Sequence, residues 1–280
     1  MMDQLNILAW AGRSQTETGG VDAGMAQQIH ATLGTPGHRA PEAGDLLDPL
    51  WHWCAFAPSD PTRDLRADGH PRAGDFLPPL RLPRRMWAGG QLRFHRPARV
   101  GDPLERRSVV ANVDQKSDTM VLIRVNHEIH GPQGLVLEER QDIVYLPIPE
   151  EFTPPAKRAM PNGSALLRSH PMTEALLFRF SAITFNAHRI HYDIPYAQEV
   201  EKYPGLVVHG PLQAMLLMRA ACDARNSTPT DFSFRALHPM FAGSDLQIAA
   251  DDGEDGELRL CTGQDGHQGM VATALFQGVV

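Results

Sequence analysis

The sequence predicts an α+β protein built from two copies of one unit, in which a long helix packs on a curved antiparallel sheet. Two observations favour this class. Four apolar segments separated by turn residues lie between residues 90 and 146, and four more follow in the same order near the end of the chain. A segment that begins near residue 211 repeats its apolar residues at helical spacing. The 280 residues leave room for two modest domains.

The first ninety residues are expected to be largely irregular. One helical pattern runs from about Val21 to Leu33, and the aromatic stretch PLWHWCAF follows it. The next stretch, DGHPRAGDFLPPLRLPRR, is rich in glycine and proline, which interrupt regular structure. We therefore expect a long ordered excursion before the first strand.

The first unit is predicted to form an antiparallel meander. Turn sequences RVGD, DQKSD and GPQG separate four strands at about 90–97, 103–113, 119–130 and 135–146. The stretch PIPEEFTPPAKRAMPNG follows, and its five prolines make it the best candidate for a linker. The predicted division is therefore a first repeat at 1–150, a linker at 151–164 and a second repeat at 165–280.

The end of the chain repeats this pattern. Alignment of RFHRPARVGDPL with RALHPMFAGSDL pairs Pro97 with Pro239, Gly101 with Gly243, and Leu104 with Leu246. The second unit has a clear helix, PLQAMLLMRAACDAR, which opens with Pro211 at a first helical position. Each unit is expected to contribute such a helix, although the first shows no clear counterpart.

Composition restricts the class of protein. The net charge of −7 and the scattered basic residues argue against binding of nucleic acid or an anionic membrane. The N-terminal stretch MMDQLNILAWAG has no basic region followed by a continuous apolar run, and no run of eighteen apolar residues occurs, so we expect a soluble protein of the cytoplasm. The sparse, separated Cys54, Cys222 and Cys261 suit a reducing compartment and provide no zinc framework.

Three histidines gather in FNAHRIHYDIPYAQEVEKYPGLVVHGPL, and three interpretations apply. His188 and His191 are three residues apart and His209 follows, which is compatible with a metal site, but Arg189 lies between them and no HExxH motif is present. The residues could equally be surface or buried histidines held by local hydrogen bonds. The third interpretation is a general base beside an oxyanion site.

The third interpretation depends on the surroundings of the cluster. LLFRFSAITFN is predicted to be a strand that ends at the histidines, and the Gly-Pro start of a helix follows about twenty residues later. Addition of water to a double bond conjugated to a thioester needs a base, an acid for the alpha carbon, and donors for the enolate-like oxygen. A neutral imidazole is a suitable base near pH 7, and the N–H of Gly210 could bind the oxygen.

Four segments resemble the MaoC-like hydratase/dehydratase family, which has the hot-dog fold. They are TFNAHRIHYDIPYA, YPGLVVHGPL, PRRMWAGGQLRFHRP with the following VGD, and FRALHPMFAGSDL, in the family's order and across nearly the whole chain. Within the family, the sequence is most similar to the subgroup of mesaconyl-C4-CoA and itaconyl-CoA hydratases and type 2 hydroxyacyl-thioester dehydratases. The resemblance implies a double hot-dog, with two curved antiparallel sheets each wrapped on a central helix. It also implies a non-catalytic first repeat and a catalytic second repeat.

The R-specific hydratases of this family carry an Asp-x-Asn-Pro-aliphatic-His signature. On this sequence the final His falls on His191, and the Asp position is occupied by Asn186. An amide can orient water but cannot take a proton. The resemblance therefore implies that His191 performs the proton transfers, that Asn186 positions the water or hydroxyl, and that Gly210 supplies the oxyanion amide, while His188 is expected to lie off the chemistry.

Five further residues are predicted to contact the substrate. His209 adjoins the oxyanion glycine, and Arg189 and Asp193 flank the catalytic histidine. Arg84 and Arg85 could hold the phosphates of CoA or a carboxylate of the substrate, because a guanidinium forks well onto both groups.

The sequence thus predicts a hydro-lyase that reversibly hydrates a short, branched or carboxylated enoyl-CoA, such as mesaconyl-C4-CoA or itaconyl-CoA. The alternatives are a 3-hydroxyacyl-ACP dehydratase of fatty-acid synthesis and a non-catalytic acyl-thioester-binding protein, which the departure at Asn186 leaves open. We expect no metal and no redox cofactor, with CoA arriving as part of the substrate, and a homodimer as the assembly.

Overall fold

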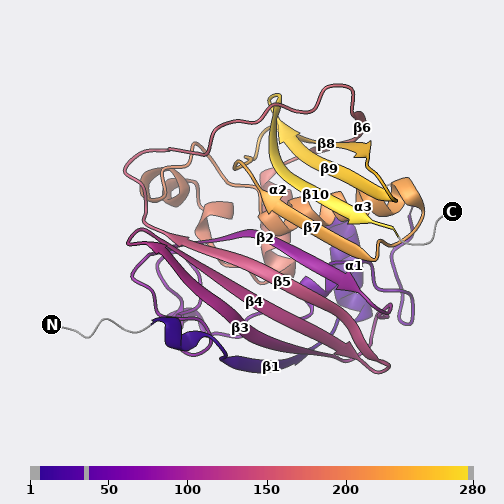
Figure 1. Cartoon of the computed structure of the whole chain (residues 1–280), viewed down its shortest axis with the longest axis horizontal. Helices are drawn as coiled ribbons and strands as arrows, with labels where there is room; N and C mark the ends of the chain where they lie inside the picture. The colour runs from indigo at the N-terminus through magenta and orange to yellow at the C-terminus, as the bar shows by residue number, and fades with distance from the viewer. Residues whose placement is uncertain (1–6, 35–37, 277–280) are drawn as a thin grey trace.

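The computed structural model describes residues 7–34 and 38–276, and its strands form one continuous ten-stranded sheet (Figure 1). Within these residues the strand order is β1-β3-β4-β5-β2-β7-β10-β9-β8-β6, and all neighbours are antiparallel. The strands are β1 (Ser14–Gly19), β2 (Arg84–Phe94), β3 (Leu104–Ser117), β4 (Met120–Gly131), β5 (Gly134–Leu146), β6 (Ala165–Pro171), β7 (Asp231–Ala236), β8 (Asp245–Asp252), β9 (Glu257–Gln264) and β10 (His267–Leu275).

The two predicted half-sheets join edge to edge through β2 and β7. Gly89 pairs with Arg235 and Leu92 pairs with Phe232 across this seam. A Cβ atom on Gly89 would lie 2.6 Å from the carbonyl oxygen of Phe234, closer than any side chain tolerates. The glycine therefore allows the two backbones to approach, and the two repeats share a single sheet rather than two separate ones.

The two halves have the same topology, which supports the predicted repeat. Reading outward from the seam, β2-β5-β4-β3-β1 corresponds to β7-β10-β9-β8-β6. Gly101 donates to Val21 O at 2.8 Å, and Gly243 donates to Met172 O at 2.9 Å. Both glycines have positive φ, 95° and 93°, a conformation that other residues rarely adopt. The aligned positions thus make equivalent turns.

Three α-helices are present in the described residues: α1 (Ala23–Leu33), α2 (Glu174–Ile183) and α3 (Gly210–Arg225). The prediction of a strand at LLFRFSAITFN was wrong, because this stretch forms most of α2. Thr173 caps the helix by accepting from Leu176 N at 3.1 Å, and Leu177, Phe180 and Ile183 lie buried at helical spacing. A short, strongly apolar and aromatic run carries too little periodicity to distinguish the two elements.

The expectation of a long central helix holds only for the second repeat. There, α3 contacts β7, β9 and β10 and is buried on most of its surface. In the first repeat α1 corresponds to α2, since each follows the outermost strand of its half. Residues 34–83 take the place of α3, and in their described part they form only short 3-10 turns at Trp51–Cys54 and Thr62–Asp64.

The correspondence around the start of the central helix can be followed residue by residue. Leu47 donates to Ala98 O at 2.8 Å, just as Val208 donates to Met240 O at 2.8 Å, and the acceptors occupy equivalent turns. Leu47 therefore matches Val208, and two residues further on Pro49 matches Gly210.

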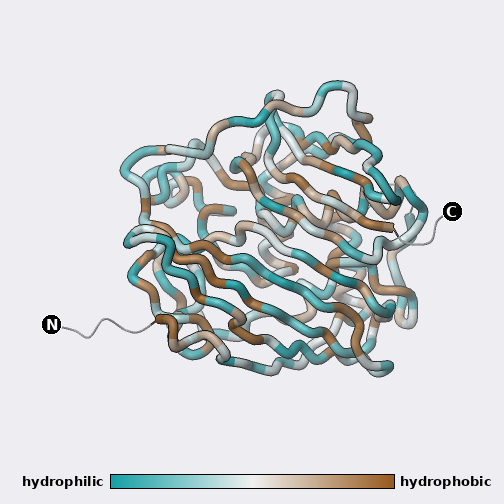
Figure 2. The backbone as a smooth tube through the Cα atoms, in the orientation of Figure 1, coloured by the Kyte–Doolittle hydropathy of each residue, from teal (hydrophilic) through white to brown (hydrophobic). Residues whose placement is uncertain are grey.

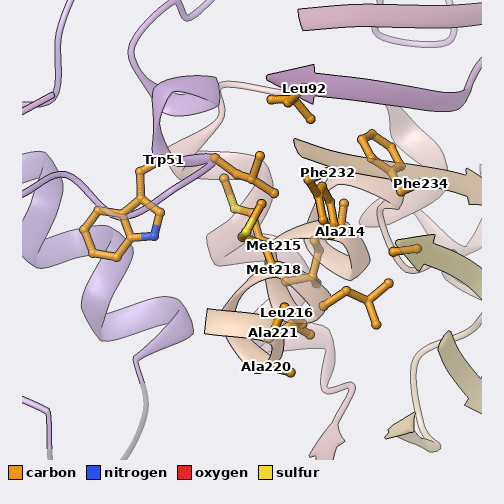
Figure 3. Packing of buried hydrophobic residues seen from close by; sticks show 14 of the residues in the cluster. Trp51, Leu92, Ala214, Met215, Leu216, Met218, Ala220, Ala221, Phe232 and Phe234 are labelled. Carbon is orange, nitrogen blue, oxygen red and sulfur yellow. The ribbon is translucent and has the colours of Figure 1, made fainter. Parts of the chain in front are cut away.

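One hydrophobic cluster spans both repeats and fixes them together. Trp51 of the first repeat lies beside Met215 and Met218 of α3, while Leu92 and Phe232 approach from the seam (Figure 3). Along the strands, hydrophobic and hydrophilic stretches alternate, as expected for a sheet with one buried face (Figure 2). No helix in the described ranges is long and apolar enough to cross a membrane.

The stretch between β5 and β6 contains no named helix or strand, and an isolated bridge joins Ala159 to His267. The division into 1–150, 151–164 and 165–280 stays a prediction, because the shared sheet and core give no separate test of its boundaries.

We expect Leu92→Ala to lower the free energy of unfolding by about 2–5 kcal/mol. The side chain of Leu92 is fully buried at the seam, so its truncation leaves a cavity there. Leu166→Ala removes the same atoms from a strand residue that is 59% exposed and should change stability by only about 0.5 kcal/mol. Urea unfolding followed by circular dichroism measures both, and equal losses would contradict a seam that contributes to the core.

Candidate active site

A cavity of about 1360 Å³ opens between the repeats and receives side chains from both. From the second repeat, Asn186, His188, His191 and Gly210 line it. From the first repeat come the start of β2, including Arg84, Arg85 and Trp87, and the loop that carries His70. The cavity thus brings together the predicted catalytic residues and a part of the chain more than a hundred residues away.

The turn after α2 positions His191. Phe185 ends the helix with a positive φ of 49°, and Asn186 N donates to Ser181 O at 2.8 Å. The side-chain oxygen of Asn186 accepts from His188 N at 3.0 Å, which closes the turn. This leaves the amide NH₂ of Asn186 as the group able to donate into the cavity.

His191 offers one ring nitrogen to a ligand. Its Nδ1 lies 2.7 Å from Val207 O, which can only accept, so Nδ1 carries the proton and Nε2 is the basic atom. Burial lowers the pKa of His191 well below its ordinary value of 6.5, and the charges that His209 and His188 would carry oppose its protonation further. The imidazole is therefore neutral at physiological pH.

His209 supports His191 from behind and does not line the cavity. Its ring stacks on that of His191 with centroids 3.6 Å apart and planes inclined by 17°. Its Nε2 is 2.9 Å from Ser181 Oγ, and its side chain is completely buried. Burial, with a smaller contribution from the charge of His188, lowers the pKa of His209 to about 3. His209 was predicted to contact the substrate, but in the structure it contacts the ring of His191 instead.

His188 belongs to a buried network that reaches the first repeat. Its Nε2 lies 3.0 Å from Glu201 Oε1, and the second oxygen of Glu201 lies 3.6 Å from Arg84 Nε. Arg84 also donates to the hydroxyl of Tyr203. Burial raises the pKa of Tyr203, so its hydroxyl stays protonated. The charge of Arg84 is thus already compensated within the protein.

A loop of the first repeat lies against the turn that carries His188. The ring of His70 is 4.3 Å from that of His188, and its Nδ1 is 3.2 Å from Asp68 Oδ2. Burial lowers the pKa of His70 to about 4. Burial alone would raise the pKa of Asp68, but the hydrogen bonds and charge of His70 lower it to about 2.

Sequence reasoning missed His70, Asp68 and Glu201, which lie in an irregular loop and a short turn without a motif. One signal was present in the loop. Gly69 has a φ of 92°, and a Cβ atom there would lie 1.8 Å from Ala187 O. Only glycine lets the loop come this close to the turn that carries Ala187 and His188.

Gly210 presents its backbone to the cavity at the first residue of α3. Its N–H donates to no other group in the parts of the chain that the structure describes. A Cβ atom on Gly210 would meet Trp87 O at 3.8 Å, an ordinary contact, so no neighbouring atom requires glycine here. The free N–H at the positive end of the helix dipole can bind a partial negative charge.

Two of the predicted substrate-binding residues pair with each other outside the cavity. Arg189 lies 2.8 Å from a carboxylate oxygen of Asp193 and also donates to Ala67 O at 3.0 Å. Asp193 accepts from Tyr196 N at 3.1 Å. Together they fix the turn that carries His191.

Arg85, in contrast, lines the cavity, and its side chain makes no hydrogen bond or ion pair to any other described residue. Its charge acts on His70 and helps to lower the pKa of that histidine. The side chain of Arg85 is half-buried and can contact a ligand in the cavity.

Within the described ranges, no group of three or more His, Cys, Asp or Glu side chains is arranged to hold a metal ion. The two closely spaced histidines of the motif have perpendicular rings, at 86°, and each already uses one nitrogen for a protein partner.

Comparisons with known proteins agree with this architecture. The family model described as hydroxyacyl-thioester dehydratase type 2 matches residues 50–242. The chain is 41% identical to mesaconyl-C(4)-CoA hydratase of Chloroflexus aurantiacus, over 99% of this chain and 100% of that protein.

Solved structures confirm the predicted fold class. A MaoC-like dehydratase from Phytophthora capsici aligns with a TM-score of 0.76 at 13% identity, covering 98% of this chain and 97% of its own. A Mycobacterium tuberculosis protein described as having a double hotdog fold aligns with a TM-score of 0.60 at 16% identity, covering 94% and 95%.

The buried neutral histidines predict a loss of stability in mild acid. The pKa of His209 is about 3 in the folded chain and near 6.5 when exposed, so the unfolded chain takes up the proton first as the pH falls. Between pH 6.5 and 5, above the range where carboxylates titrate, each such histidine should cost about 1.4 kcal/mol per pH unit.

His209→Gln should reduce the pH dependence of the unfolding free energy by about that slope, since the amide can still bond to Ser181 and does not titrate. His130→Gln, in a partly exposed strand residue, is the matched control and should leave the slope as in the unmodified chain. Denaturant titrations at several pH values measure the slope, and an unchanged slope in His209→Gln would be incompatible with a neutral buried histidine.

Proposed function

Because the chain belongs to the hydroxyacyl-thioester dehydratase type 2 family, we propose that it reversibly adds water to the double bond of a short carboxylated enoyl-CoA, with mesaconyl-C4-CoA as the principal substrate. The class of reaction is that of a carbon–oxygen hydro-lyase, shared by the family and the full-length relative. One observation supports the proposal most strongly: a neutral histidine with a single free nitrogen and an unpaired helix-start N–H line the same cavity.

In the proposed reaction His191 is the base. A neutral Nε2 can accept a proton from water as the oxygen attacks the beta carbon, and the hydrogen bond from Nδ1 to Val207 holds the required tautomer. Asn186 takes part as a donor, because its oxygen is occupied by His188 N while its NH₂ group can bind the oxygen of the water.

Gly210 is the proposed oxyanion donor. Negative charge develops on the thioester oxygen as the enolate forms, and an N–H that is fixed before the reaction stabilises it without reorganisation. The fully formed α3 helix adds its dipole in the same direction. The absence of a side chain lets the thioester approach the N–H closely.

Arg85 is the proposed partner of the free carboxylate of the acyl group. It is a cation without a partner in the described residues, and it lies on the cavity wall near the histidines. Arg84, also predicted to bind substrate, is compensated by Glu201 and Tyr203, so we propose that it contributes indirectly. The phosphates of CoA are separated from the thioester by the whole pantetheine arm and would need other partners.

The remaining expectations are part of the same proposal. The reaction needs no metal ion or redox cofactor, since an imidazole and a backbone amide supply the proton transfer and the electrostatic stabilisation. CoA enters as part of the substrate. The homodimer and the location in the cytoplasm stay predictions.

A 3-hydroxyacyl-ACP dehydratase is the second candidate, because the description of the matching family, hydroxyacyl-thioester dehydratase type 2, does not specify the carrier of the thioester. Parallel assays with CoA and ACP thioesters separate the two candidates. A protein that binds these thioesters without any turnover would instead be the non-catalytic acyl-thioester binder.

His191→Gln should lower kcat/KM for hydration about a hundredfold to ten-thousandfold, because the amide can bond to Val207 O but cannot take a proton. The loss of enoyl-thioester absorbance measures the rate. Unfolding midpoints close to that of the unmodified protein would exclude misfolding as the cause, and full activity in this variant would refute the assignment of the base.

Arg85→Met should lower kcat/KM for mesaconyl-C4-CoA about tenfold to a hundredfold, the effect of one charge-assisted hydrogen-bonded pair, and leave crotonyl-CoA, which lacks a carboxylate, unaffected. Arg93→Met alters an arginine of the same strand that pairs with Asp231 at the surface, and neither substrate should respond to it. Equal decreases in kcat/KM on both substrates would show that Arg85 does not bind the carboxylate of the acyl group.

A further inference from the structure

Hydration of an enoyl thioester involves two proton transfers, and of the groups assigned so far only His191 can carry a proton. Water gives a proton to the base, and the alpha carbon takes a proton either from that same group in a later step or from a separate acid. His191 has one usable nitrogen, because Nδ1 is bonded to Val207 O. The amide of Asn186 does not release or take up protons near neutral pH.

We propose that His188 is the second catalytic residue, the general acid that protonates the alpha carbon during hydration, and that Glu201 is its positioning residue. This assignment rests on the proposed hydratase function. It replaces the sequence-based expectation that His188 lies off the chemistry.

The position of His188 suits this role. It lines the cavity next to His191, with ring centroids 5.4 Å apart. Its Nε2 is bonded to Glu201 Oε1, and its Nδ1 makes no hydrogen bond within the described part of the chain. Two imidazoles therefore meet one cavity, each with one nitrogen held by the protein and the other available to a ligand.

The partners of the two rings differ in charge. His188 is bonded to a carboxylate that is only 2% exposed, whereas His191 is bonded to a neutral carbonyl. An imidazolium at His188 thus has a hydrogen-bonded counter-ion, and one at His191 does not. Environments that favour opposite protonation states in two neighbouring groups are typical of an acid and base pair.

Arg84 fixes the carboxylate in place. Its Nε lies 3.6 Å from Glu201 Oε2, and it bonds to Tyr203 on the other side. The other titratable neighbour of His188 is His70, whose ring lies 4.3 Å away and which is itself bonded to Asp68. Arg85 acts on His70 from the cavity wall.

The proton balance closes over one turnover. Water transfers a proton to His191 Nε2 while its oxygen bonds to the beta carbon, and the electron pair of the double bond moves toward the thioester oxygen. The alpha carbon then takes the proton of His188 Nδ1 as the carbonyl re-forms. The enzyme is left with a proton on His191 and none on His188 Nδ1, and return of that proton to His188 restores the starting state.

The surroundings of the two rings suit return of the proton, because burial disfavours charge on His191, whereas His188 lies 3.0 Å from a carboxylate oxygen of Glu201. In the dehydration direction the roles reverse. Neutral His188 removes the proton from the alpha carbon, and protonated His191 assists departure of the hydroxyl group.

The test compares His188→Gln with the unmodified protein on mesaconyl-C4-CoA. Glutamine can keep the bond to Glu201 but cannot transfer a proton, so kcat should fall about a hundredfold or more in both directions. His170→Gln, a histidine away from the cavity, should keep full activity. In His188→Ala, added imidazole should restore part of the lost rate, which a purely structural loss would not allow.

Glu201→Gln probes the positioning residue. Loss of the carboxylate bonded to His188 should lower kcat and change the shape of its pH profile, whereas a purely structural loss would lower kcat by the same factor at every pH. Glu199→Gln, an exposed residue of the same turn, should leave the profile in place.

The outcomes separate the two proposals. An unmodified protein that hydrates no enoyl-CoA overturns the hydratase function, and the assignment of His188 with it. An active unmodified protein together with a fully active His188→Gln variant, or a lost activity that imidazole does not restore, overturns the assignment alone.

Discussion

The edge-to-edge pairing of β2 with β7 is the constraint on which the rest of the molecule depends. It joins the two half-sheets, and its close approach requires glycine at residue 89. The same strands lead into the cavity: Trp87 lies on β2 beside Gly210, and residues 236–239 follow β7. Because a hydrogen-bonded ladder fixes spacing and register together, the seam fixes the position of β2 relative to β7, and residues at the ends of both strands line the cavity.

Much of the fold followed from local signals. The strands of the first unit alternate and are separated by turn residues, so β4 and β5 lie close to the predicted 119–130 and 135–146. β2 runs from Arg84 to Phe94 and so begins well before the predicted 90–97, while β3 continues to Ser117, beyond the predicted end at residue 113. The prediction for α2 was wrong because its apolar residues form a nearly continuous run, which fits a strand as well as a helix. The pairing of β2 with β7 could not be predicted, since an antiparallel edge accepts many partners and the choice depends on packing of the whole core.

The active-site residues divide in the same way. His191, Asn186 and Gly210 sit in contiguous motifs and line the cavity, as do Arg84 and Arg85. Arg189 and Asp193 form an ion pair with each other. A spacing of four residues permits such a pair, but the sequence does not show whether it forms. Glu201 and the loop carrying His70 approach only in the folded chain, so no pattern of neighbouring residues marks them.

The missing central helix changes what the first sheet can bury. Ser108, His127 and Glu139 lie side by side on β3, β4 and β5, and each is more than nine-tenths buried. The equivalent row in the second repeat is Ala250, Leu260 and Ala272, which packs under α3.

His52 and Trp53 satisfy the buried carboxylate of Glu139 with hydrogen bonds of 3.0 Å each. Burial alone would raise the pKa of Glu139, but the hydrogen bond from His52 and the charges around it lower this pKa to about 2. A short 3-10 turn, Trp51–Cys54, therefore stands where the second repeat has a long apolar helix, and Trp53 of this turn lines the cavity.

Pro49 gives this asymmetry a chemical meaning. It stands where the second repeat has Gly210, and proline has no N–H to offer an oxygen anion. Substitution of the surrounding side chains could rebuild an acid and a base in the first repeat, but the donor belongs to the backbone and cannot be restored without changing this residue. In the proposed mechanism the duplication is therefore a division of labour, in which the second repeat supplies the reacting groups and the first repeat contributes to the wall of the cavity.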